Sequence, residues 1–281
     1  MHNRKTQQHF QPPQTGTNIA PSGNPLPSRT DSNGIIRIAY QNVHGVHTKG
    51  FSIPTELEAI ESLSIDIMGM SETNCPWTPK AQSKFNFMMN QRFKSSRTIY
   101  SSSPPITNAT YQPGGNLLTI TGHTTGRITD SGSDAWGRFC WYCLRRRRDE
   151  GVIIITAYRV CQRKHTSTGP LTAHRQQYIL MRQDGVTDPD PHQRLLTDVE
   201  ALIRRYREKG YRPIILMDAN RDYLAPSHPD TPLATFIQNM SLQDPFYDKF
   251  HITPRTYLYG TRGLDYILLD PALTTTIRSI G

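Results

Sequence analysis

PIILMDAN, residues 213–220, combines a run of large apolar residues with two polar residues, Asp218 and Asn220, at its end. A compact apolar run with a polar boundary is typical of a buried β-strand. GVIIITAY, residues 151–158, has the same form and ends at Tyr158. The two segments predict a sheet whose buried strands end in polar side chains.

Segments of similar texture predict further strands at residues 35–40, 65–70, 116–120, 138–144 and 264–270. Helices are predicted at residues 55–63, 169–185 and 188–210. The last of these carries an apolar stripe made of Leu195, Val199, Leu202 and Ile203. Strands with interposed helices, without an internal repeat, predict an α/β domain.

Residues that are common in catalytic sites lie at the ends of these strands: Asn42, Glu72, Tyr158, Asp218, Asn220 and Asp265. In sheet-based α/β folds, side chains at strand ends converge into a cleft. A single strand-end Asp is most simply a cap or turn residue. That explanation fits the ordered series poorly, so we expect a functional site.

The chemistry that suits this set is phosphodiester hydrolysis. Glu72 is a suitable carboxylate ligand for Mg²⁺, which neutralises phosphate charge. Asp218 is the candidate base or orienting group for the attacking water. Asn42, Asn220 and Tyr158 are donors that can stabilise charge on phosphate oxygens.

Five motifs carry a family resemblance: QNVHG (41–45), MSETN (70–74), TAYR (156–159), MDAN (217–220) and LDYILL (264–269). In this order they resemble the signatures of the endonuclease/exonuclease/phosphatase (DNase I-like) superfamily. The resemblance covers residues 35–281. It implies an α/β fold of four layers, with two packed mixed β-sheets flanked by helices.

The same resemblance implies roles for individual residues. Asn42 would order the metal and phosphate site, Glu72 would bind the metal, and Tyr158 would contact phosphate. Asp218 and Asn220 would act on the water and the phosphate, with Asp265 as a supporting carboxylate. Asn74 and Arg159, in the same motifs, would contact nucleic acid.

The subtype resembles the apurinic-type endonuclease-like domains of non-LTR retrotransposon proteins, which accompany reverse transcriptases. SETN, TAYRVCQ (156–162) and TYLYGTRGLDYILL (256–269) carry this likeness. It implies a DNA endonuclease that uses Mg²⁺ or Mn²⁺, fused to or associated with a reverse transcriptase, and nuclear if it acts on chromosomal DNA. Two alternatives stay open: a non-catalytic nucleic-acid-binding domain of the same fold, and a phosphatase of the superfamily.

The chain departs from the family pattern in two places. Met217 stands where the GDxN motif has Gly, a conservative change in a buried strand. The closing Ser-Asp-His motif does not occur in the sequence. The resemblance therefore predicts a fragment that lacks the last strand, with little or no activity.

Residues 1–34 are rich in Gln, Pro, Ser, Thr and Asn, and predict a disordered tail before a domain at 35–281. The tail has no apolar core of a secretory signal, and no run approaches the roughly 20 apolar residues of a membrane helix. These features predict an intracellular protein that does not enter a membrane.

The net charge is +9, of which the tail carries +2 through Arg4, Lys5, Arg29 and Asp31. A basic domain favours polyanions such as DNA, although positive charge also serves solubility. Arg145 to Arg148 form a basic run between two predicted strands. The simpler interpretation is a solvated turn, and the alternative is a patch that binds nucleic acid.

Cys140 and Cys143 form a C-x-x-C pair in a predicted strand. Residues three apart on a strand point to opposite faces, which does not suit a shared zinc ion or disulfide. The sequence also lacks a second such pair. We expect the cysteines to be structural, in a reducing compartment.

Overall fold

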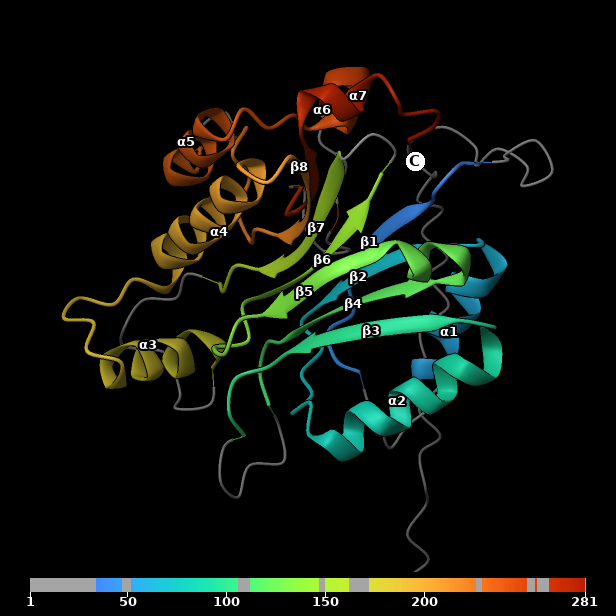
Figure 1. The fold of residues 1–281 in the computed structure, drawn as a ribbon. Coiled ribbons are helices and arrows are strands. Elements are labelled where there is room, and N and C mark those ends of the chain that lie inside the picture. Colours follow the sequence, from blue (N-terminus) through green and yellow to red (C-terminus); the bar gives the residue numbers. More distant parts are fainter. Residues whose placement is uncertain are drawn as a thin grey trace, which may run out of the picture.

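The computed structural model describes residues 34–46, 52–105, 112–146, 150–161, 172–225, 229–251, 256 and 263–280. They form two β-sheets packed face to face, with helices on both outer sides (Figure 1). The predicted four-layer α/β fold is confirmed. The predicted tail lies outside the described residues except for Gly34.

The first sheet has the strand order β1-β2-β4-β3. Its strands are β1 (Ile38–Asn42), β2 (Ile67–Ser71), β4 (Asn116–Thr121) and β3 (Ser96–Ser101). The second sheet has the order β5-β6-β7-β8-β9. Its strands are β5 (Ile128–Ser133), β6 (Phe139–Arg145), β7 (Gly151–Tyr158), β8 (Tyr211–Asp218) and β9 (Asp265–Leu269). Both sheets are mixed, because β1 pairs with β2 and β7 with β8 in parallel.

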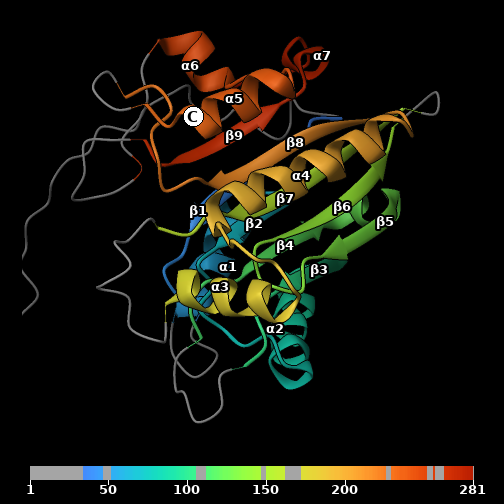
Figure 2. The same ribbon diagram turned by 90° about the vertical axis from the view of Figure 1, so that its left-hand side faces the viewer.

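Helices cover the outer face of each sheet. The first sheet carries α1 (Ser52–Ser62) and α2 (Pro79–Arg92). The second carries α4 (Pro191–Arg207), which lies along β7 and β8, and α5 (Thr231–Asn239) (Figure 2). The remaining elements are α3 (Ala173–Gln183), α6 (Pro245–Phe250), α7 (Pro271–Thr274) and the 3₁₀ helix η2 (Gly122–Arg127).

Asp-Pro pairs begin three of these helices, namely α4, α6 and α7. In each pair the Asp carboxylate accepts hydrogen bonds from backbone N–H groups of the first turn, as Asp190 does from His192 and Gln193. Pro suits the first helical position because the backbone N–H that it lacks would have no partner within the helix there, and because its ring fixes φ near the helical value. The local sequence thus sets where these helices start.

The strands predicted from apolar runs are all present, with bounds shifted by up to three residues. β3 and β5 lie outside those predictions. The sequence of β5, ITDSGS, is polar because this edge strand leaves most of its side chains in solvent. No helix among the described residues is long and apolar enough to cross a membrane.

Cys140 and Cys143 belong to different parts of the core. Cys140 packs between the two sheets, and Cys143 packs on the outer face of the second sheet with α4. The prediction that this pair points to opposite faces is confirmed. None of the four cysteines forms a disulfide bond.

The two sheets approach each other closely at Gly69 in β2. A Cβ at this position would lie 2.7 Å from both Leu216 Cδ1 and Thr156 Oγ1 on the facing sheet. Both neighbours are completely buried. The spacing of the sheets therefore depends on a residue without a side chain.

We expect Gly69→Ala to lower the free energy of unfolding by about 1–3 kcal/mol, the usual cost of overpacking a core. Gly126→Ala is the matched control, because a Cβ there meets no atom within 4 Å. The control should be neutral or slightly stabilising, since Ala restricts the unfolded chain. Urea unfolding of both variants tests this, and equal effects would contradict the close packing at Gly69.

Candidate active site at the shared edge of the sheets

Polar side chains meet where β1, β2, β7 and β8 end and β9 begins. In the first sheet Asn42 is paired with Ser71, the residue before Glu72. In the second sheet Tyr158, Asp218 and Asp265 lie side by side on neighbouring strands. The structure therefore brings together residues that are far apart in the sequence, as predicted for strand ends.

A hydrogen bond between Asn42 and Asp218 links the two sheets at this edge. Asn42 Nδ2 donates to Asp218 Oδ2 at 2.8 Å, and the backbone N–H of Asn220 donates to Asp218 Oδ1 at 2.9 Å. Asp218 is only 2% exposed. Burial raises the pKa of this carboxyl well above its ordinary value, and the negative charges of Asp265 and Glu72 raise it further.

Asp265 is the first residue of β9 and lies directly opposite Asp218. Burial, together with the nearby Glu72, raises the pKa of its carboxyl from the ordinary 3.8 to about 6, against the lowering effect of a hydrogen bond with Thr256. Its Oδ1 is buried and has no hydrogen-bond partner among the described residues. A buried acceptor without a partner is available to a ligand.

Glu72 lies at the more open side of the cluster. Its side chain is 15% exposed, and its Oε2 is 3.1 Å from Nδ1 of His44, which is 90% exposed. Burial raises the pKa of the Tyr158 hydroxyl well above its ordinary value, and a hydrogen bond with Glu72 adds to this effect. Tyr158 therefore stays protonated at neutral pH and can act as a donor.

The backbone around the site is unusual. His44, Glu72, Asn74 and Asn220 have φ between +46° and +50°, and they are four of the seven non-glycine residues with positive φ in the described part of the chain. Such conformations are uncommon outside glycine, and clusters of them mark sites that the rest of the fold must hold in place.

The donor set suits a hard divalent cation. The negative charge of Glu72 raises the pKa of the Asp218 and Asp265 carboxyls, and a cation would relieve that repulsion. Among the described residues, no group of three or more His, Cys, Asp or Glu is placed so that together they could hold a metal ion. Mg²⁺ is usually held by one or two carboxylates plus water and substrate, so the residues fit this ion.

Asn74 and Arg159 have structural contacts in the described chain. Asn74 Oδ1 accepts a hydrogen bond from the backbone N–H of Gly114 at 2.8 Å. Arg159 is only 3% exposed, and its guanidinium donates to Asp230 Oδ2 at 2.8 Å. Asp230 also caps α5, so the Arg159 side chain ties the end of β7 to that helix.

Two residues near the site were not singled out by the sequence patterns. Tyr40 donates a hydrogen bond to Ser71 Oγ, and burial, with Asp218 and Asp265, raises its pKa well above the ordinary value. It precedes Asn42 by two positions on β1, so strand alternation could have placed it on the same face. His44 offers no comparable signal, because its contact with Glu72 depends on the fold of two separate loops.

The chain matches known proteins in three-dimensional structure but not in sequence. No described protein family and no curated protein matches the sequence. Among solved structures, the 3' phosphatase NExo from Neisseria, bound to a product DNA hairpin, matches with a TM-score of 0.55 and 12% identity. The match covers 86% of this chain and 89% of that one.

An AP endonuclease from Archaeoglobus fulgidus matches with a TM-score of 0.54 and 15% identity, over 86% of this chain and 89% of its own. The catalytic domain of human Nocturnin, with a bound sulfate anion, matches with 0.54 and 13%, over 84% and 82%. The chain has the DNase I-like α/β fold. The polar cluster around Glu72, Asp218 and Asp265 lies at one end of this two-sheet sandwich, where strands of both sheets end.

The raised pKa of Asp265 has a consequence for stability. A folded-state pKa of about 6, above the ordinary 3.8, means that the folded chain holds this proton more tightly than the unfolded chain. The associated stability is present at low pH and is lost as pH rises through about 6. Ionised Asp265 is thus a cost to folding at neutral pH.

We expect Asp265→Asn to be more stable than the unchanged chain at about pH 8, by on the order of 1–3 kcal/mol from the size of such a shift. The difference should shrink at about pH 4–5, where the folded carboxyl is already protonated. Urea unfolding in metal-free buffer at both pH values measures this. If the two chains differ by the same free energy of unfolding at both pH values, the ionised Asp265 carboxylate does not destabilise the fold.

Proposed function

We propose that this chain is a metal-dependent phosphodiester hydrolase acting on nucleic acid, a DNA endonuclease of the retroelement type. The observation that carries the proposal is the cluster of Glu72, Asp218 and Asp265 at the shared edge of the sheets, with neutral donors beside it. Mutually repelling carboxyl groups are costly to fold, and they are typical of sites that bind metal or move protons.

Asp218 is the proposed base. Its two oxygens each accept one hydrogen bond from the protein, which leaves lone pairs for a water molecule. The raised pKa brings the carboxylate closer to the basicity that proton abstraction at neutral pH requires. The water loses its proton to Asp218, its oxygen attacks phosphorus, and the leaving oxygen takes a proton from solvent as the P–O bond breaks.

Tyr158 and Asn42 supply the neutral part of the site. The Tyr158 hydroxyl remains protonated and can donate to a phosphoryl oxygen as charge develops on it. Asn42 holds Asp218 in place through its side-chain amide. Glu72, Asp265 and their neighbours would hold Mg²⁺ or Mn²⁺, which when bound neutralises phosphate charge.

Nucleic acid is the proposed substrate for three reasons. The chain is basic, with a net charge of +9. Its structural neighbours include a 3' phosphatase bound to product DNA and an AP endonuclease. Its five ordered motifs resemble the endonuclease-like domains that accompany reverse transcriptases. The resemblance further favours DNA as the target and a reverse transcriptase as the associated protein.

Because no Ser-Asp-His motif occurs in the sequence, we expect this chain to nick supercoiled DNA slowly, and only with Mg²⁺ or Mn²⁺, so that EDTA abolishes the nicking. Glu72→Gln should lower the rate by about 10²–10⁴-fold, as is typical for loss of a catalytic group. Glu208→Gln is the matched control, because Glu208 is exposed at the end of α4, the helix that runs away from the site. Circular dichroism should show that both variants are folded.

Metal binding gives a readout that does not depend on catalysis. Saturating Mg²⁺ should raise the melting temperature of the unchanged chain, because a ligand that binds only the folded state stabilises it. Glu72→Gln should lose this shift and Glu208→Gln should keep it. DNA binding without nicking would support the non-catalytic domain, and hydrolysis confined to phosphomonoesters would support a phosphatase.

A further inference from the structure

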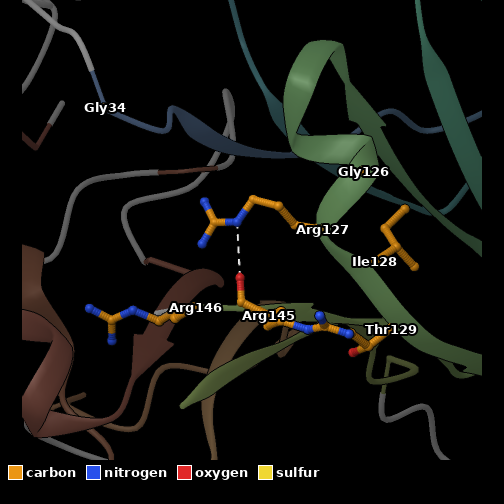
Figure 3. Close-up of a pocket in the computed structure, with 7 residues that line it drawn as sticks. All are labelled: Gly34, Gly126, Arg127, Ile128, Thr129, Arg145 and Arg146. Carbon is orange, nitrogen blue, oxygen red and sulfur yellow. Dashed lines mark hydrogen bonds between the residues drawn. The ribbon is translucent and has the colours of Figure 1, made fainter. Parts of the chain in front are cut away.

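A second feature of the molecule lies at the opposite end of the strands from the candidate active site. It is a cavity of about 580 Å³ between the end of η2, the start of β5 and the end of β6. Its lining residues are Gly34, Gly126, Arg127, Ile128, Thr129, Arg145 and Arg146 (Figure 3). Three of the seven are arginines and none is acidic, so the cavity is suited to an anion.

Within the part of the chain that the structure describes, few acidic groups neutralise these arginines. Arg127 Nε donates to the backbone carbonyl of Arg145 at 2.9 Å, which fixes the guanidinium and leaves its terminal amino groups available. Arg145 forms no ion pair within the described part of the chain. Arg146 forms a long ion pair with Glu150, with 3.9 Å between the guanidinium nitrogen and the carboxylate oxygen. Arg212 also pairs with the Glu150 carboxylate, at 3.7 Å.

The arginines approach the cavity from different parts of the chain. Arg145, the last residue of β6, and Arg146, which follows the strand, extend in opposite directions (Figure 3). Arg127 comes from the end of η2, on the neighbouring connection. A guanidinium offers several N–H donors in one plane and binds phosphate oxygens in pairs.

The cavity is well separated from the candidate active site. Arg145 pairs with Gly151 at the start of β7, whereas Tyr158 is the last residue of that strand. Seven residue steps along a strand correspond to roughly 23 Å. A straight duplex lying across the catalytic edge therefore does not reach the arginines, and a ligand here would be a separate segment or a separate molecule.

We propose that this arginine-lined cavity is a second nucleic-acid-binding site that holds a stretch of phosphodiester backbone. The three arginines that line this open cavity bring several positive charges together, which match the repeating charge of a polynucleotide. The inference rests on the proposed function only in the choice of nucleic acid as the polyanion. Arg147 and Arg148 follow in the sequence, and the proposal does not depend on them.

The test compares two double variants that each remove two positive charges. Arg127→Ala/Arg145→Ala changes the cavity. Arg204→Ala/Arg205→Ala is the matched control, because both residues are exposed in the last turn of α4 and do not line the cavity. Fluorescence anisotropy with a labelled DNA duplex, in EDTA so that no cleavage occurs, gives affinities between about 50 and 200 mM salt.

We expect the cavity variant to bind more weakly and to lose about 1.8 from the slope of log affinity against log salt, because two phosphate contacts disappear. The control should change the slope by less than half of that amount. Equal effects of the two double variants would overturn the proposal. Full displacement of the DNA from this site by inorganic pyrophosphate at constant ionic strength would also overturn it, in favour of a small phosphate ligand.

The outcome is separate from that of the proposed function. If the cavity is not a binding site, the cavity variant matches its control in DNA binding, while the effect of Glu72→Gln on nicking is unchanged. If the chain is not a hydrolase, nicking is absent, while the salt slopes of the two double variants still differ. Thermal unfolding of both double variants verifies that they are folded.

Discussion

The hydrogen bond from Asn42 to Asp218 joins the two sheets at the candidate active site. Asp218 is almost completely buried, and burying a carboxylate without partners is strongly unfavourable. The bond from Asn42 and the backbone N–H of Asn220 compensate part of this cost. The site can exist only where the first sheet delivers Asn42 to the end of β8, so the packing of the two sheets and the chemistry are coupled.

The close packing between the sheets maintains this arrangement. Gly69 allows β2 to approach Leu216 and Thr156, and the apolar cluster between the sheets extends along the length of the strands. The rigid core supports conformations that would be unfavourable alone, including positive φ at Glu72 and Asn220. Stability in the core thus compensates for strain and repulsion at the edge, a common arrangement in functional sites.

The two ends of the strands have opposite electrostatic character. One end gathers the carboxyl groups of Glu72, Asp218 and Asp265, which would attract a cation. The other end carries the arginines of the cavity, which would attract an anion. Because strands of both sheets run between these ends, the fold keeps the two groups apart and prevents them from neutralising each other.

The sequence by itself determined the strands whose apolar runs end in polar residues, the opposite orientations of Cys140 and Cys143, and the positions where Asp-Pro pairs begin helices. These features depend on neighbours along the chain, since strand alternation and helix capping are local. β3 and β5 could not be found in this way, because an edge strand such as β5 is defined by its partner and not by an apolar pattern.

Tertiary structure alone decided which side chains meet. Asn42 and Asp218 are separated by 176 residues, and Arg159 is turned inward by Asp230, 71 residues away. The raised pKa of Asp265 and the contact of His44 with Glu72 arise from burial and from loops brought together in space. Such properties follow from distances between remote residues, and the local patterns of a sequence do not contain those distances.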